Sequence, residues 1–179
     1  MSTPHGSEFS RVVDIRQIND EPVLLEPDEA ERRRLAARFD LTAIAAMRAE
    51  VALAVEGTEV TATGRLTADI VQMCAISGED FPVRIDEPLS FRFVHPAAAH
   101  RPDEEVEIGA DDCDEIEYEG SAFDLGEAIA QSLALAIDPF AEGPNADAAR
   151  REHGLAGEAG SGAFAALAAL KNPSSQKKD

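Results

Sequence analysis

The sequence predicts an α+β fold: an antiparallel sheet, open or barrel-like, with two main helices and a flexible C-terminal tail. Apolar residues recur at every second position over residues 43–93, which is the period of strands that cover a core with one face. Two segments, 27–39 and 124–137, contain helix start and stop signals. The chain has 179 residues and is 44% hydrophobic, so we expect one domain with tails.

The N-terminal part is predicted to begin with a flexible segment at 1–8, followed by the domain at 9–140. Short strands are expected at 9–15 and at 22–25, where the second is alternatively the entry to a helix. In the first helix, Pro27 suits the first helical position, with acidic residues near the start and arginines toward the end.

The period-two region predicts a meander of strands. Apolar residues alternate over 49–55 and again over 60–70, and the short polar segment between them predicts a hairpin. A further alternating stretch at 81–93 extends the sheet, and Pro88 marks a break or an edge position in it.

Acidic residues crowd segment 103–119, directly before the second helix. Ile116 and Tyr118 alternate there with glutamates, as do Val106 and Ile108. Successive side chains of a strand face opposite sides, so we expect strands with carboxylates on their wet side. The acidic side is interpreted as a solvated face or as a docking surface for a basic protein.

The second helix is the most clearly specified element. Asp124 suits the N-cap, and Glu127 follows at the spacing of a capping box. Gly126 in the first turn costs about 1 kcal/mol relative to alanine, so we expect another segment to approach closely there. Leu135 and Ile137 are expected to widen the apolar side. The central apolar stripe consists of Leu125, Ala128, Ile129, Leu133 and Ala136.

The C-terminal region 141–179 has a different composition. Its first part, up to residue 162, is rich in Gly, Ala, Pro and charge and is interpreted as a linker. A short helix is predicted at 163–170, before a polar tail.

Charge and composition exclude several classes of protein. The formal net charge is −19, which disfavours a broad basic footprint for nucleic acid and favours a basic protein partner. The N-terminus lacks an apolar signal-peptide core, and no apolar run approaches the roughly 20 residues that span a bilayer. We therefore expect a cytoplasmic protein with reduced thiols and no membrane association.

No motif indicates catalysis. The sequence has no P-loop, no Gly-x-Ser-x-Gly elbow and no His-Glu-x-x-His, and the acidic run lacks the central glycine of a calcium loop. The field of the acids around Cys113 opposes thiolate formation there. We predict no catalytic residue, no cofactor and no metal; a small metal-dependent enzyme is the disfavoured alternative.

Two segments resemble the YceD-like family, also called domain of unknown function 177. The first is "IEYEGSAFDLGEAIAQSLALAIDPF", in which an acidic stretch leads into an Asp-Leu helix. The second is "GRLTADIVQMCAISGEDFPVRIDEPLSFRFVHP", a strand ending in a cysteine and followed by further strands. The tail "FAALAALK" is similar to the alphaproteobacterial branch. The residues that match the family motifs are Cys74, Asp124, Leu125 and Gly126.

The resemblance implies a non-enzymatic role in the accumulation of large-subunit (23S-type) ribosomal RNA, through its processing or stabilisation or through assembly of the large subunit. Some family members have Cys-x-x-Cys at the position of Cys74 and further cysteines after the helix, which suggests zinc. Here Ser77 stands in place of the second thiol. A tetrahedral site needs about four ligands, so Cys74 is interpreted as a small buried hydrophobe.

Two alternative binding surfaces are compatible with this role. Direct contact with precursor RNA requires basic residues on the outer sheet face, for which the candidates are Arg65, Arg84 and Arg92. Indirect contact goes through a basic ribosomal or processing protein, for which the docking candidates are Glu105, Glu107, Glu115 and Glu117. Scattered solubilising arginines and a merely solvated acidic face are the simpler alternatives.

Overall fold

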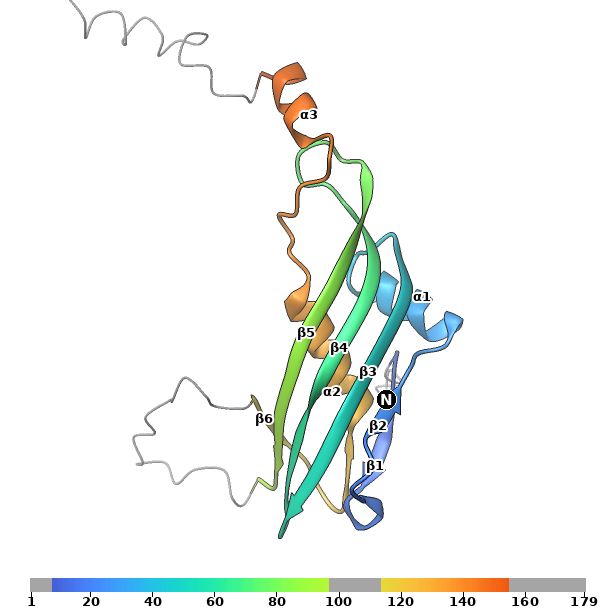
Figure 1. Cartoon of the computed structure of the whole chain (residues 1–179), viewed down its shortest axis with the longest axis vertical. Coiled ribbons are helices and arrows are strands. Elements are labelled where there is room, and N and C mark those ends of the chain that lie inside the picture. Colours follow the sequence, from blue (N-terminus) through green and yellow to red (C-terminus); the bar gives the residue numbers. More distant parts are fainter. Residues whose placement is uncertain (1–7, 97–113, 155–179) are drawn as a thin grey trace, which may run out of the picture.

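The computed structural model describes residues 8–96 and 114–154. It is an α+β structure in which three long strands run side by side and the longer helix lies behind them (Figure 1). The elements are β1 Val12–Asp14, the 3-10 helix η1 Ile15–Gln17, β2 Val23–Leu25, α1 Glu29–Arg38, β3 Ala43–Glu56, β4 Glu59–Met73, β5 Asp80–Val94, β6 Asp114–Glu117, β7 Ala122–Asp124, α2 Leu125–Ala136 and α3 Ala146–Glu152.

The main sheet has the order β2-β3-β4-β5-β6, and β1 pairs with β7 in a separate two-stranded sheet. The β2-β3, β3-β4 and β4-β5 pairs are antiparallel, whereas β6 runs parallel to β5. The main sheet is open, with β2 and β6 at its edges, so the expectation of a barrel-like sheet is not supported. The parallel pair also corrects the prediction of a purely antiparallel sheet.

The predicted hairpin is confirmed. Val55 faces Val60 and Glu56 faces Glu59 across a tight turn in which Gly57 has a positive φ of 66°. Pro88 does not break β5, because it lies inside the strand, opposite Arg65. The parallel neighbour β6 pairs only with the end of β5, from Phe91 to Val94. At Pro88 the side of β5 away from β4 therefore has no partner strand, and a residue without an N–H costs no hydrogen bond on that side.

The core lies between the inner face of the sheet, α2 and the N-terminal segment. Alternation puts one side of each long strand inward, as predicted, and α2 covers that side. Fully buried side chains come from these elements and from α1: Phe9, Leu35, Val51, Val60, Leu66, Ile70, Phe93, Leu125, Ile129 and Leu133. Burial of this apolar area is the main source of stability for the fold.

The first helix begins two residues later than predicted. Its N-cap is Asp28, whose carboxylate accepts the N–H of Glu31 at 2.8 Å, while the Glu31 carboxylate accepts the N–H of Asp28 at 2.8 Å. This reciprocal capping box satisfies two backbone donors, so Pro27 precedes the helix instead of starting it. Leu35 is buried, and Phe39 is the C-cap.

The second helix is found at its predicted position, and its stripe is buried except for the half-buried Ala136. Leu135 does not widen the apolar side, because it is 82% exposed. Before the helix, β6 and the residue after it have the predicted alternation: Ile116 is half-buried and Tyr118 is buried. The Tyr118 hydroxyl donates to the Thr58 carbonyl at 2.5 Å.

Residues 141–154 differ from the linker expected there. They include α3, and they contact the turn between β4 and β5: the Ala75 N–H donates to the Ala141 carbonyl at 3.0 Å, and the Asn145 amide donates to Glu79 at 2.7 Å. Several predictions lie outside the described residues, namely those for 1–7, Val106, Ile108, Cys113, Glu105, Glu107 and the helix at 163–170.

Candidate functional site

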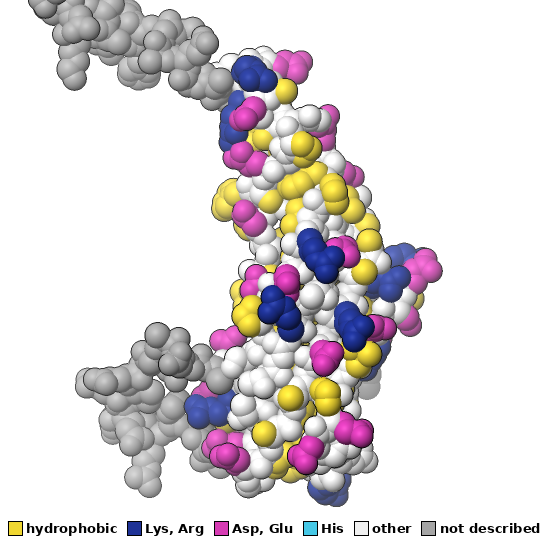
Figure 2. Space-filling view, viewed as in Figure 1, with side chains coloured by type: hydrophobic (Ala, Val, Ile, Leu, Met, Phe, Trp, Pro, Cys, Tyr) yellow, Lys and Arg dark blue, Asp and Glu magenta, His cyan; other side chains and the backbone are white. Residues whose placement is uncertain are grey.

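No described helix lies over the outer face of the three long strands β3, β4 and β5 (Figures 1 and 2). Helix α2 covers the opposite face, and α1 contacts β3. Because side chains alternate along each strand, the outward positions are polar or small. They include Arg48, Ala52 and Ala54 of β3, Thr61, Thr63, Arg65 and Thr67 of β4, and Arg84, Asp86 and Ser90 of β5.

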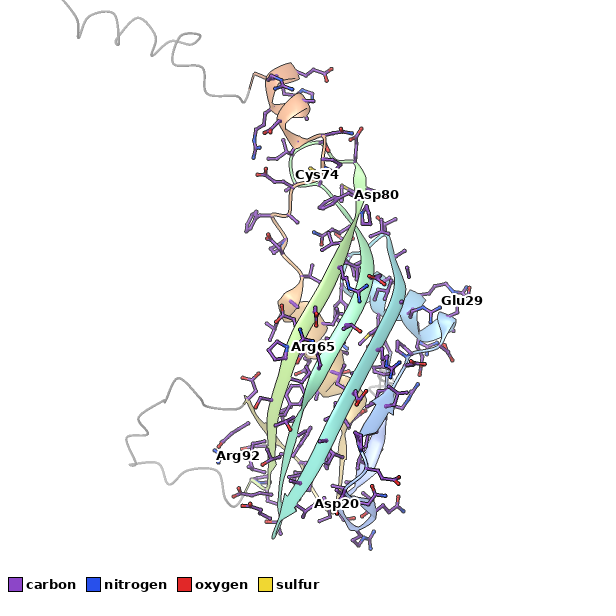
Figure 3. The ribbon with its side chains drawn as sticks, in the orientation of Figure 1. Asp20, Glu29, Arg65, Cys74, Asp80 and Arg92 are labelled. Atoms are coloured by element: carbon purple, nitrogen blue, oxygen red, sulfur yellow. The ribbon has the colours of Figure 1, made fainter. Side chains whose placement is uncertain are left out.

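Three arginines gather at the middle of this face. Arg48 lies opposite Thr67, and Arg84 lies opposite Asp69 two positions further along β4. Arg65 lies on the central strand β4 (Figure 3), two positions from Thr67 on the side away from Asp69, and dark blue side chains are seen on the middle of this face in Figure 2. The structure places Arg65 and Arg84 on the outer face of the sheet, and their role as RNA contacts stays a prediction. Arg48 joins them, and the alternation of apolar residues in β3 could have predicted that it faces outward.

Each of these arginines has an acidic neighbour. Arg65 Nε donates to Asp86 at 2.5 Å, and this hydrogen bond lowers the pKa of the Asp86 carboxyl. Arg84 contacts Asp69 at 3.4 Å, and Arg48 contacts Glu50 at 3.6 Å. The face is therefore a mosaic of alternating charge and not a broad basic footprint. We call this set, Arg48, Arg65, Arg84 and their carboxylates, the arginine mosaic.

Arg92 lies away from the mosaic. It is eight positions from Arg84 on β5, a separation of about 26 Å at the usual rise of a strand. Figure 3 shows it near the opposite end of the sheet from Asp80, and its guanidinium pairs with Glu115 of β6. Glu115, a docking candidate, thus pairs with Arg92, an RNA-binding candidate. Glu117 lies on the same short strand and is exposed.

The family-motif residue Asp124 has a structural role. Its carboxylate accepts the N–H of Glu127 at 3.2 Å, which caps α2 as predicted. It also accepts the backbone N–H of Arg11 at 2.8 Å and the hydroxyl of Ser10 at 2.6 Å. One side chain thus fixes both the helix start and the N-terminal segment, and it has no partner that indicates catalysis.

The other two residues of this motif complete the same junction. Leu125 is fully buried, and its N–H donates to the Arg11 carbonyl at 3.0 Å. A Cβ atom at Gly126 would lie 2.6 Å from the Phe9 carbonyl oxygen and 2.7 Å from the Arg11 nitrogen. Both atoms belong to the backbone, so only glycine allows this close approach. The segment predicted to approach Gly126 is therefore the N-terminal one.

The remaining motif residue, Cys74, directly follows β4 and begins the turn near the top of the molecule (Figure 3). It is 2% exposed, as expected of a small buried side chain. Its sulfur accepts the N–H groups of Ile76 at 3.4 Å and Ser77 at 3.3 Å. Hydrogen bonds from the Ser77 side chain, then from the backbone N–H groups of Ser77 and Gly143, lower the pKa of the thiol to about 7. Sequence reasoning missed this shift.

Over residues 8–96 and 114–154, no group of three or more His, Cys, Asp or Glu side chains is arranged to hold a metal ion. In the same ranges, none of the helices has the length and apolar character needed to cross a membrane. The exposed mosaic offers guanidinium, hydroxyl and carboxylate groups to a polar partner.

Comparison with known proteins identifies one family. The family model described as "Large ribosomal RNA subunit accumulation protein YceD" matches residues 62–171. This range includes β5, most of β4, the Cys74 turn and the whole of α2. No curated protein and no solved structure gave a significant match.

Proposed function

Because the chain belongs to the YceD family of large ribosomal RNA subunit accumulation proteins, we propose that it acts in the cytoplasm as a non-enzymatic factor that binds precursor large-subunit RNA through the arginine mosaic. The family match covers well over half of the chain and includes most of two of the three long strands that form this face. The family description links the chain to accumulation of the RNA, and direct contact is our own inference.

The observation that supports direct contact is the position of Arg48, Arg65 and Arg84 together on a face that no described helix covers. Their side chains are 55%, 62% and 70% exposed. A guanidinium can exchange an exposed carboxylate partner for a phosphate at small cost, since such surface pairs contribute at most about 1 kcal/mol. The acidic remainder of the protein repels RNA, so we expect binding to use few phosphates and to depend on which arginines are present.

The test is a fluorescence anisotropy titration of a precursor large-subunit RNA fragment with the full chain. The variant Arg48→Gln/Arg65→Gln/Arg84→Gln should weaken binding and reduce the salt dependence of log K by about 0.7 for each phosphate that is no longer neutralised. A control variant, Arg16→Gln/Arg150→Gln/Arg151→Gln, changes the net charge equally but lies off the face. Equal weakening by both variants would exclude the mosaic as the RNA-binding surface.

A basic protein as the direct partner is the second candidate, and the acidic edge of the sheet favours it. Glu115 and Glu117 of β6 lie at this edge, and the formal charge of the chain is −19. In this case Glu105→Gln/Glu107→Gln/Glu115→Gln/Glu117→Gln should release a basic ribosomal or processing protein in a pull-down. The mosaic variant should retain that protein.

The non-enzymatic part of the proposal has its own check, because a metal-dependent enzyme needs a metal. Elemental analysis of the purified full chain should show no stoichiometric zinc. Zinc bound at one equivalent would favour the enzymatic alternative.

A further inference from the structure

A hollow of about 380 Å³ lies between the start of α1 and the outer face of the sheet, and part of the arginine mosaic lines it. Three arginines from three different elements line it: Arg32 of α1, Arg48 of β3 and Arg84 of β5. Arg65 does not line it. The hollow is therefore a distinct place at which guanidinium groups converge from several directions.

The local sequence explains why this space is open. The pairing of β3 with β4 shifts register between Ile44 and Ala46, which marks a bulge in the strand. The residues at the bulge, Ala45 and Ala46, have only a methyl group each, and both line the hollow. Larger side chains at these positions would fill the space above the sheet.

The acidic groups in the hollow hold the arginines loosely. Arg84 lies 3.4 Å from Asp69, and Arg48 lies 3.9 Å from Glu26. Arg32 donates through Nη1 to the Pro27 carbonyl at 2.9 Å. Each guanidinium has five N–H donors, so these contacts leave donors for a further acceptor. The tight pair on this face, Arg65 with Asp86 at 2.5 Å, lies outside the hollow.

We propose that this hollow binds a phosphate group, held by hydrogen bonds from Arg32, Arg48 and Arg84. The lining contains three cations, Arg32, Arg48 and Arg84, and two carboxylates, Glu26 and Asp69. A third carboxylate, Glu50, contacts Arg48 at 3.6 Å from outside the hollow. A tetrahedral oxyanion accepts hydrogen bonds from several sides, and the planar guanidinium fork matches two of its oxygens. The inference rests on the proposed function in one respect: it names the place where an RNA phosphate is held.

The first experiment titrates the full chain with inorganic phosphate at constant ionic strength and follows backbone amide signals by NMR. Signals from Ala46 and Thr67 should shift, and Arg84→Gln should raise the Kd by about tenfold, the effect expected for one charge-assisted hydrogen bond. Arg33→Gln is the matched control, because it removes the same charge one position from Arg32 on an exposed part of α1. It should leave the Kd within about twofold of the starting value.

Removal of a carboxylate distinguishes binding at this hollow from an effect of the net charge of the protein. Asp69→Asn removes the carboxylate beside Arg84 and should lower the Kd for phosphate several-fold. Glu152→Gln changes the net charge by the same amount on α3 and should have little effect. Absence of shifts with phosphate, or equal effects of Asp69→Asn and Glu152→Gln, would overturn the proposal.

A short single-stranded RNA then separates the two sources of the phosphate group. If the RNA shifts the same amides and inorganic phosphate displaces it, the ligand is a phosphodiester of RNA. If only inorganic phosphate binds, the hollow accepts a free phosphate, and the RNA proposal fails while the site stands. A third outcome is that Arg65→Gln weakens RNA binding, Arg84→Gln does not, and inorganic phosphate shifts no amide signal. In that case the proposed function stands and the hollow is excluded as a phosphate site.

Discussion

The carboxylate of Asp124 accepts the backbone N–H of Arg11 at 2.8 Å, across 113 residues of sequence. The same carboxylate caps α2 through the N–H of Glu127. A capping residue normally satisfies donors of its own helix, which is a local effect. Here it also joins the N-terminal segment to the helix that covers the core, so the first and last parts of the domain depend on one side chain.

Asp124→Ala should therefore destabilise the protein more than an ordinary cap substitution. We expect a decrease of about 2–3 kcal/mol in the free energy of unfolding, from the cap and from the N–H of Arg11 that no longer has its acceptor. Asp28→Ala is the comparison, because Asp28 caps α1 within its own turn and should cost about 1 kcal/mol. Urea unfolding of both variants gives the two values, and equal decreases would contradict a tertiary role for Asp124.

Gly126→Ala should be destabilising even though alanine is the better helix former. The added Cβ would lie within 2.7 Å of two backbone atoms of the N-terminal segment, neither of which can rotate away. We expect a net decrease of about 1–3 kcal/mol in the free energy of unfolding, which exceeds the benefit of about 1 kcal/mol in helix propensity. The exposed Gln131→Ala in the same helix is the control and should be close to neutral. An unfolding midpoint at or above that of the unmodified protein would show that the segment moves aside.

The long strands and α2 could be predicted because local patterns determine them. Alternation in 49–55 and 60–70 reports which face is buried, and the N-cap with its apolar stripe defines the helix. The acidic run before α2 follows the same rule, since Tyr118 points inward while Glu117 points to solvent. The charge contrast between these neighbouring segments therefore reflects which side each residue faces.

The features that could not be predicted depend on contacts between distant segments. The parallel pairing of β6 with β5 depends on where the intervening chain returns, and alternation does not encode strand direction. Helix α3 is seven residues long and has one buried residue, Ala146. Such a short helix has little intrinsic stability, and contacts with the β4–β5 turn support it. Arg32 joins Arg48 and Arg84 only because α1 packs beside β3.

The pair of Arg11 and Glu31 predicts a decrease in stability in acid. Hydrogen bonds from Arg11, opposed in part by burial, lower the pKa of Glu31 from 4.5 to about 2. A carboxyl whose folded pKa is lowered stabilises the fold fully above its ordinary pKa and loses this contribution as pH falls to the folded pKa. Arg11→Gln should therefore cost about 1–2 kcal/mol at neutral pH. The cost should shrink between about pH 4.5 and about pH 2.

Urea unfolding of both proteins over that pH range measures this difference. Arg33→Gln provides the control, because its partner Glu29 is 78% exposed and the pair is screened by solvent. The control should cost little at any pH. A cost for Arg11→Gln that stays constant down to the lowest pH would mean that the contact of Arg11 with the Phe9 ring, at 4.6 Å, matters more than its pairing with Glu31.

Cys74 should ionise near neutral pH although it is buried. The Ser77 hydroxyl and the N–H groups of Ser77 and Gly143 stabilise the thiolate and lower the pKa of the thiol from 9.0 to about 7. In a Cys113→Ser background, the ultraviolet band of the thiolate should therefore rise around pH 7. Ser77→Ala removes the largest of these hydrogen bonds and should move the midpoint upward.

The same lowered pKa has a consequence for stability, with a defined sign. The thiolate contribution is complete above the ordinary pKa of 9.0 and is lost as pH falls through about 7. The unmodified protein should therefore gain stability relative to Cys74→Ala as pH rises from about 7 to 9. Comparison of urea unfolding at the two ends of this range tests the expectation. A constant difference would mean that Cys74 acts only as a buried hydrophobe, because a group that stays neutral in the folded protein up to its ordinary pKa adds no pH dependence there.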